Sequence, residues 1–294
     1  MRLRAGRREL ELGGPPLLMG VVNASPDSFS DAGDHPDLPA RAAELVAAGA
    51  AVLDVGGESA VGGRPPVAPS EERDRVVPLI QSLTARHDVL ISVDTYKPEV
   101  AEAAIEAGAG MINDVSGLHD EKLTEVCACT GAALVLMHTR VAPKGTLLRP
   151  DAYDDVVEDV VGFLRERMEA AVGAGVSPEQ IVLDPGPDFA KTPAQTVAVL
   201  RELDRLHALE RPLLLAISRK YFLGAITGRP PAERLAGTLA AAMWAADAGA
   251  AILRVHDVAA VRDALAVKAV LEGRDEVPAF DAGDEELKWI RTDR

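Results

Sequence analysis

The run LLMGVVNA (17–24) is apolar from its first residue until Asn23, where a polar side chain interrupts it. A strand buried on both faces of a parallel sheet reads as such a continuous apolar run. Seven later runs repeat the pattern, each ending in polar or charged residues and followed by a helix-like segment, at 51–57, 89–95, 111–116, 133–139, 181–186, 213–218 and 251–258. Eight such units predict a (β/α)8 barrel whose active face is the rim at the carboxyl ends of the strands.

The length of the chain, 294 residues, suits a single barrel with short extensions. We expect an N-terminal lead-in over 1–16, the barrel over 17–271 and an acidic tail over 272–294. Helices are expected at 70–86, 98–107, 153–174, 193–209 and 231–248, where prolines or Ser/Asp caps often mark the start. Glycines where a helix should end support these boundaries: Gly49, Gly108, Gly131, Gly175 and Gly249.

The composition excludes several partners and locations. With 31 basic and 46 acidic side chains, the net charge of −15 argues against nucleic acid and against an anionic membrane. No apolar segment follows the positive N-terminus as a secretion signal would require, and the next apolar run is too short to span a membrane. Cys127 and Cys129 have no metal-ligand spacing, and we expect them to be buried thiols in a reducing, cytoplasmic compartment.

Acidic and amide side chains lie at the carboxyl ends of four of the predicted strands. Asp54, Asp94 and Asp184 each end one strand, and Asn113 and Asp114 end another. Buried carboxylates and amides must find hydrogen-bond donors. One aspartate at a strand end is usually a loop cap, but three on one rim together with an asparagine predict a site for a flat heterocycle that carries several N–H groups.

Basic side chains follow the last two strands. Arg219 and Lys220 come after the seventh strand, while Arg254 and His256, two residues apart on the eighth, share a face. This region of barrels frequently binds phosphate, and Asn23 could hold a metal ion or a phosphate oxygen from the opposite side. The alternative is that these bases merely neutralise the nearby acids.

Other chemistries have less support. The chain has no His-x-His after the first strand, no His-Glu-x-x-His and no phosphate-binding Walker loop. Lys220 could be a Schiff-base lysine, but no acid–base partner for it can be singled out.

Taken together, these motifs resemble the dihydropteroate synthase family over about residues 17–270. The matching stretches follow the family's order: MGVVNASPDSFSDAG (19–33), DVGGES (54–59), SVDT (92–95), NDVS (113–116), MH (137–138), DPG…F…K (184–191), SRK…FLG (218–224) and RVHDV (254–258). The resemblance implies a single-domain barrel that condenses 6-hydroxymethyl-7,8-dihydropterin pyrophosphate with p-aminobenzoate and releases pyrophosphate, using Mg²⁺. It implies a homodimer, which the apolar segment 232–250 would suit.

The resemblance also implies roles for individual residues. Lys220, Asp94 and Asp184 would be the catalytic residues, and they would hold the pterin together with Asn113, while Met137 lies against the ring. Asn23, also the metal ligand, would hold the pyrophosphate with Arg254 and His256. The loops 25–36, 58–69 and 139–152 lie on the carboxyl-end face and suit lids, and the resemblance implies that the first two close over the site. Its remaining members are expected to be Asp27, Phe29, Asp54 and Arg219.

The arylamine half departs from the family. After GGES the chain has Ala60-Val61-Gly62-Gly63 where the family has Thr-Arg-Pro-Gly, and Arg64 is the candidate replacement for that arginine. Tyr221 stands where the family has a small serine, and Gly186-Pro187-Asp188-Phe189-Ala190-Lys191 replaces Gly-Ile-Gly-Phe-Gly-Lys. We expect Phe189, Tyr221 and Arg64 to contact the arylamine.

Two alternatives stay open at this point. The chain could be a synthase-like paralogue that binds the pterin but condenses another amine or none. It could also be a pterin-binding methyltransferase, although Lys220, Arg254 and His256 would then have no pyrophosphate to hold. Lowered sensitivity to sulfonamides would follow from a changed arylamine pocket.

Overall fold

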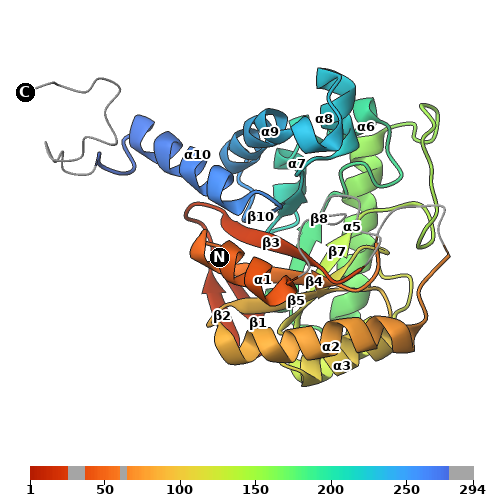
Figure 1. Ribbon diagram of the computed structural model, residues 1–294. Coiled ribbons are helices and arrows are strands. Elements are labelled where there is room, and N and C mark those ends of the chain that lie inside the picture. The colour runs from red at the N-terminus through yellow and green to blue at the C-terminus, as the bar shows by residue number, and fades with distance from the viewer. Residues whose placement is uncertain (26–36, 60–64, 278–294) are drawn as a thin grey trace, which may run out of the picture.

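The computed structural model describes residues 1–25, 37–59 and 65–277. In these ranges eight parallel strands form one sheet in the order β8-β7-β6-β5-β4-β3-β10-β9 (Figure 1). Leu183 of β8 forms a parallel bridge with Leu213, just before β9, so the sheet closes on itself. The strands are β3 (Leu17–Asn23), β4 (Val52–Gly56), β5 (Leu90–Asp94), β6 (Met111–Asp114), β7 (Ala133–Met137), β8 (Ile181–Asp184), β9 (Leu214–Ala216) and β10 (Ile252–Val255). The predicted (β/α)8 barrel is confirmed.

Helices surround this barrel (Figure 1). They are α1 (Leu38–Ala47), α2 (Pro69–Arg86), α3 (Pro98–Glu106), α4 (Lys122–Thr130), α5 (Val156–Gly173), α6 (Pro193–Arg201), α7 (Asp204–His207), α8 (Tyr221–Thr227), α9 (Leu235–Asp247) and α10 (Val258–Leu271), with 3₁₀ turns η1 (Pro178–Gln180) and η2 (Pro231–Glu233). The predicted helix 193–209 is two helices, because Glu202 leaves the helical conformation (φ −118°, ψ 35°). Helix α5 begins three residues later than predicted, since the Asp155 carboxylate accepts hydrogen bonds from Val157 N and Glu158 N and so caps it.

Alternation along the strands separates two hydrophobic clusters. On β4, Val52 belongs to a cluster inside the barrel, whereas Leu53 and Val55 belong to the cluster between the sheet and the helices. Successive side chains of a strand point to opposite faces, so Asp54 points inward with Val52. The same parity places one side chain from each strand end at the mouth of the barrel.

The N-terminal segment is a structural element that the sequence did not suggest. Residues 1–16 were predicted as a plain lead-in, but β1 (Arg2–Ala5) and β2 (Arg8–Glu11) form an antiparallel hairpin. Leu3, Ala5 and Leu12 are buried and join the cluster inside the barrel. That cluster includes residues from the amino-terminal halves of the strands, so the hairpin closes the end of the barrel opposite the polar rim.

The two cysteines differ in exposure. Both are free thiols on α4, Cys127 buried and Cys129 exposed. The prediction of two buried thiols is therefore wrong for Cys129, because residues two apart on a helix project to different sides. None of the helices in the described ranges is long and apolar enough to cross a membrane.

Candidate active site

The strand ends open into one cavity of about 440 Å³. This volume is in the range of small-molecule sites. The side chains of the polar rim meet here as predicted, and the cavity is lined by Asn23, Asp94, Asn113, Met137, Asp184, Phe189, Arg219, Lys220, Tyr221, Arg254 and His256. Asp54 lies beneath them, fully buried. The predicted residues Asp27, Phe29 and Arg64 lie outside the described residues.

Arg254 links two aspartates on the acidic side of the cavity. Its Nε donates to Asp54 Oδ2 at 2.6 Å and its Nη2 to Asp94 Oδ2 at 2.8 Å. Asn113 Nδ2 donates to the same Asp54 oxygen at 3.0 Å. Burial raises the pKa of Asp94 to about 7, although Arg254 opposes the shift. Arg254 therefore lies among the acids, and the predicted separation into an acidic and a cationic half is wrong for this side chain.

Two other predicted bases, Arg219 and His256, present less positive charge to the cavity than the sequence suggested. Arg219 is paired with Asp257 at 2.8 Å. His256 Nδ1 lies 3.0 Å from Ser218 Oγ, and burial together with Arg254 lowers the His256 pKa to about 3. The imidazole is therefore neutral at pH 7 before an anion binds.

Lys220 is the cation at the second side of the cavity. Its Nζ lies 4.3 Å from the centre of the Phe189 ring and donates to Pro187 O at 3.1 Å. Burial lowers the pKa of Lys220, while Asp188 and Asp184 oppose that shift. Asp184 accepts a hydrogen bond from Gly186 N at 2.7 Å, and burial raises its pKa. The Lys220 ammonium and the buried Asp184 carboxylate thus face the same part of the cavity.

Two polar strand ends do not reach the cavity. Asp114 points outward, where its carboxylate accepts from Ser116 N, Ser116 Oγ and Leu118 N at 2.6–2.8 Å. It is a loop cap, so the sequence-based grouping of Asp114 with the site acids is wrong. His138 also points outward: its Nε2 lies 2.8 Å from Asp159 Oδ1 of α5 and its ring packs edge-on against Phe163.

Lys191 is a buried lysine whose environment the sequence did not reveal. Its side chain is fully buried, and Nζ lies 2.7 Å from His138 Nδ1, 3.0 Å from Gly186 O and 3.1 Å from Phe189 O. Burial lowers the pKa of Lys191 to about 7 and that of His138 to about 4. The ammonium thereby holds the turn that carries Phe189, in which Asp188 and Ala190 have positive φ values of 64° and 52°.

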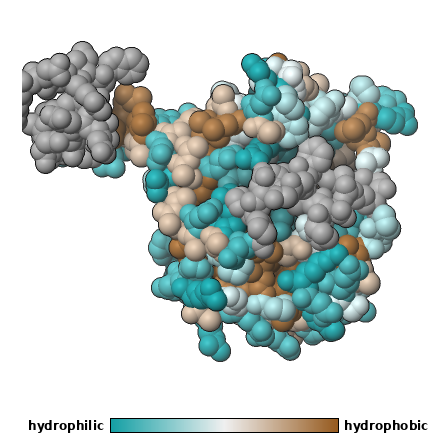
Figure 2. All heavy atoms as spheres, in the orientation of Figure 1, coloured by the Kyte–Doolittle hydropathy of each residue, from teal (hydrophilic) through white to brown (hydrophobic). Residues whose placement is uncertain are grey.

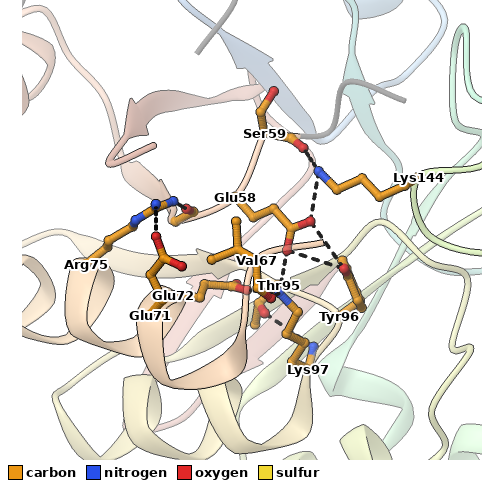
Figure 3. A network of polar contacts seen from close by, with 11 residues as sticks. Glu58, Ser59, Val67, Glu71, Glu72, Arg75, Thr95, Tyr96, Lys97 and Lys144 are labelled. Carbon is orange, nitrogen blue, oxygen red and sulfur yellow. Dashed lines mark hydrogen bonds and ion pairs between the residues drawn. The ribbon is translucent and has the colours of Figure 1, made fainter. Parts of the chain in front are cut away.

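A second buried network joins the loops after β4, β5 and β7 (Figure 3). Glu58 pairs with Lys144 at 2.8 Å and with Lys97, and Lys97 also pairs with Glu72. Tyr96 OH donates to Glu58 at 3.3 Å. Burial alone would raise the pKa of Glu58, but hydrogen bonds from Lys144 and Lys97 lower it overall. Glu58 belongs to the stretch DVGGES (54–59), but no spacing in the sequence signals partners so far along the chain.

The cavity and the barrel together define an enzyme of the (β/α)8 class with a small-molecule site at the carboxyl ends of its strands. The family described as pterin binding enzyme matches residues 19–256. The dihydropteroate synthase of Escherichia coli K12 is 39% identical over 94% of this chain and 98% of its own length.

Solved structures agree. The Yersinia pestis dihydropteroate synthase in a sulfonamide drug complex has a TM-score of 0.87 and 38% identity, covering 94% of this chain and 100% of that chain. The Xanthomonas albilineans enzyme with 4-aminobenzoic acid has a TM-score of 0.84 and 43% identity, covering 92% of this chain and 99% of that one. The chain belongs to the dihydropteroate synthase family.

Proposed function

We propose that this chain condenses 6-hydroxymethyl-7,8-dihydropterin pyrophosphate with p-aminobenzoate and releases pyrophosphate. The observation that carries the proposal is the meeting of Asp94, Asn113, Asp184 and Lys220 in one cavity with Arg254 and His256 beside them. Membership of the family and the 4-aminobenzoic acid bound to the Xanthomonas albilineans enzyme support the same substrates.

The acids at the bottom of the cavity suit the pterin. Asp184 and Asn113 are almost fully buried. Their side-chain oxygens can accept hydrogen bonds from N–H groups at the edge of a heterocycle. Met137, also buried, lines the same space, and its thioether can pack against a ring. Asp54 Oδ1 is buried and accepts no hydrogen bond within the described ranges, which fits a site completed by a ligand or by water.

Arg254, although paired with the acids, and His256 suit the pyrophosphate. When the C–O bond to the pterin methylene breaks, its electron pair leaves with the pyrophosphate, and nearby cations stabilise that charge. We assign this role to Arg254, and to His256 once a phosphate oxygen raises its pKa. The amine nitrogen then forms the new C–N bond at the methylene and loses a proton, while the pterin ring and the neighbouring carboxylates stabilise the cationic carbon.

Magnesium fits this site as a partner of the substrate. A Cβ on Gly56 would lie 3.5 Å from Asp94 Cβ and 3.8 Å from Asn23 Oδ1, so glycine leaves space between these side chains. No group of three or more His, Cys, Asp or Glu side chains within the described ranges could hold a metal ion, and Mg²⁺ usually takes one or two protein ligands plus water and phosphate oxygens. We assign Asn23 as the protein ligand; the bound ion would neutralise charge on the pyrophosphate.

The outer end of the cavity would take the arylamine. Phe189 and Tyr221 line it, and Tyr221 is 55% exposed. The segment after β7 also contributes Gly145 to Leu148 to this cavity, and closure of such loops would exclude water from the reacting cation.

A pyrophosphate-release assay tests the proposal. Purified protein with pterin pyrophosphate and Mg²⁺ should release pyrophosphate at an appreciable rate only when p-aminobenzoate is also present. Lys220→Ala should lower kcat/KM by about 10²-fold or more, as for loss of one electrostatic contact to the transition state. Asp88→Asn at the opposite end of the barrel should not change it. Binding of pterin pyrophosphate without a p-aminobenzoate-dependent product would favour the paralogue alternative, and failure of pyrophosphate to bind competitively would favour the methyltransferase.

We also propose a homodimer formed through α9 and α10. Apolar surface gathers over these helices (Figure 2), and Trp244, Val267 and Leu271 are 53%, 61% and 82% exposed. Burying such side chains is the usual driving force for association. A mass twice that of the chain in light scattering, reduced by Leu271→Asp, is expected. We place the enzyme in the cytoplasm, where a reducing environment preserves the exposed thiol of Cys129.

A further inference from the structure

His138 and Lys191 belong to the quoted stretches 137–138 and 184–191, yet the proposed reaction uses neither side chain. Both residues are fully buried. They form one hydrogen-bonded chain that runs from Asp159 of α5, through His138 and Lys191, to the turn that carries Phe189. This chain joins the layer of helices to the wall of the cavity.

The hydrogen bonds of this chain have a defined direction. Burial alone would raise the pKa of Asp159, but hydrogen bonds from His138 and Arg140 lower it overall. The Asp159 carboxylate is therefore ionised and can only accept, so His138 Nε2 carries the proton of the 2.8 Å contact between them. Burial lowers the pKa of His138 to about 4. The neutral ring thus has a lone pair on Nδ1, which accepts from Lys191 Nζ at 2.7 Å.

The Lys191 ammonium has three N–H groups and three close acceptors. Besides His138 Nδ1, these are Gly186 O at 3.0 Å and Phe189 O at 3.1 Å, whereas His138 O is more distant at 3.4 Å. A charged donor forms stronger hydrogen bonds than a neutral one, and the pKa of Lys191, lowered to about 7 by burial, keeps the ammonium as the main form below pH 7. Both ends of the turn 186–189 are therefore tied to one atom that His138 orients.

The turn 186–189 in its turn contacts Lys220 at two points. Pro187 O accepts from Lys220 Nζ at 3.1 Å, and the Phe189 ring centre lies 4.3 Å from the same atom. The first residue of the turn also donates its N–H to the Asp184 carboxylate at 2.7 Å. A shift of the turn would therefore displace the Lys220 ammonium and remove a hydrogen bond from Asp184, the two charged groups that face the same part of the cavity.

We propose that Lys191, oriented by His138 and Asp159, is a positioning residue for Lys220. This inference rests on the proposed function, because it names what fixes a side chain that the reaction uses. Within the described ranges Lys191 is not among the residues that line the cavity, so it acts through the backbone of the turn 186–189. Loss of the hydrogen bond that orients Lys191 should lower catalysis although the group that is removed touches no substrate.

Two substitutions of His138 separate positioning from packing. The His138 ring packs edge-on against Phe163, with 5.0 Å between the ring centres. His138→Phe keeps a ring there but offers Lys191 no acceptor. His138→Asn loses the ring but keeps an acceptor, because its side-chain oxygen is bonded to Cγ as Nδ1 is in histidine. A positioning role thus predicts more activity in His138→Asn than in His138→Phe, and a role in packing alone predicts the reverse order.

Steady-state kinetics at about pH 6, where Lys191 is charged, measures this order. His138→Phe should lower kcat/KM for the pterin pyrophosphate about tenfold, as for one lost hydrogen bond to a charged group. His138→Asn should stay within about threefold of the wild type. Lys191→Met, which frees both ends of the turn, should lower kcat/KM by about 10²-fold.

Calorimetric titration with pyrophosphate and Mg²⁺ is the second measurement. Pyrophosphate is assigned to Arg254 and His256, which lie on and directly after β10, so its affinity should stay within about twofold of the wild type in all three variants. His207→Phe is the matched control: His207 lies at the opposite end of the barrel, where its Nε2 contacts Ala248 O at 2.7 Å. It should change neither kcat/KM nor pyrophosphate affinity.

The outcomes separate this inference from the proposed function. A kcat/KM of His138→Phe that equals or exceeds that of His138→Asn overturns the inference while the proposed function stands, and so does a loss of pyrophosphate affinity in parallel with activity. If the wild type releases no pyrophosphate with p-aminobenzoate, the proposed function fails instead. Titration of the same variants with a hydroxymethylpterin then decides the inference, and equal affinities in His138→Phe and His138→Asn would overturn it.

Discussion

Lys191→Met should remove a pH-dependent component of stability that the wild-type chain carries. The Lys191 ammonium is fully buried and is held by His138 Nδ1 and by the carbonyl oxygens of Gly186 and Phe189. Burial lowers its pKa from 10.5 to about 7; the charge of Lys220 adds to the shift, and Asp184 and Asp159 oppose it. Methionine has a similar length but neither charge nor donors.

The sign of the effect follows from proton linkage. The unfolded chain keeps the Lys191 proton up to about pH 10.5, whereas the folded chain releases it near pH 7. The unfolded state therefore binds more protons between these values, and the free energy of unfolding rises with pH across that window. One pKa unit corresponds to about 1.4 kcal/mol, so this lysine should contribute about 1.4 kcal/mol per pH unit between pH 8 and 10, as an upper limit.

Urea unfolding at pH 8, 9 and 10 measures the effect. The free energy of unfolding of the wild type minus that of Lys191→Met should increase with pH at about that rate, in addition to a constant difference from the lost hydrogen bonds. Lys268→Met is the matched control, because this lysine, whose side chain is 16% exposed, pairs with Asp247 and Glu272 and its pKa is raised. Parallel pH dependences for the wild type and Lys191→Met would refute the reasoning.

Two further substitutions probe the cavity. Arg254→Lys should lower kcat/KM for the pterin pyrophosphate by about 10²-fold, because lysine cannot span Asp54 and Asp94 as a guanidinium does; steady-state kinetics showing less than a threefold loss would contradict this. Lys144→Met removes the ion pair with Glu58 and should raise KM for the arylamine about tenfold while KM for the pterin pyrophosphate stays constant, since the loop after β7 loses an anchor. Equal changes in both KM values in the same assay would indicate a general loss of structure instead.

The barrel and the residues around its mouth could be predicted from the sequence, because the alternation of inward and outward side chains along a strand is a local property. A run such as 17–24 is apolar on both faces, and its last inward residue, here Asn23, must lie at the rim. The same alternation explains the error at Asp114 and the outward position of His138. Asp114 and His138 each lie one residue beyond an inward side chain, Asn113 or Met137, so they point outward and form structural contacts. Their polarity alone did not distinguish them from site residues.

Contacts between distant segments could not be predicted. Glu58 meets Lys144 and Lys97 only because the loops after β4, β5 and β7 converge (Figure 3). The hairpin of β1 and β2 is short, and its burial depends on the open end of a barrel built by later residues. Arg254 was expected to be apart from the acids, but its reach across the barrel brings it to Asp54 and Asp94. These contacts depend on the reach of long side chains and on the closure of the barrel, which brings distant segments together.

Binding of the two parts of the first substrate, measured separately, tests the central claim most directly. Calorimetric titrations would use a hydroxymethylpterin and, independently, pyrophosphate with Mg²⁺, on the wild type, Asp184→Asn and His256→Ala. We expect Asp184→Asn to weaken pterin binding at least tenfold with pyrophosphate binding retained, and His256→Ala to do the reverse. Unchanged pterin affinity in Asp184→Asn would contradict the assignment of the buried strand-end carboxylates to the heterocycle.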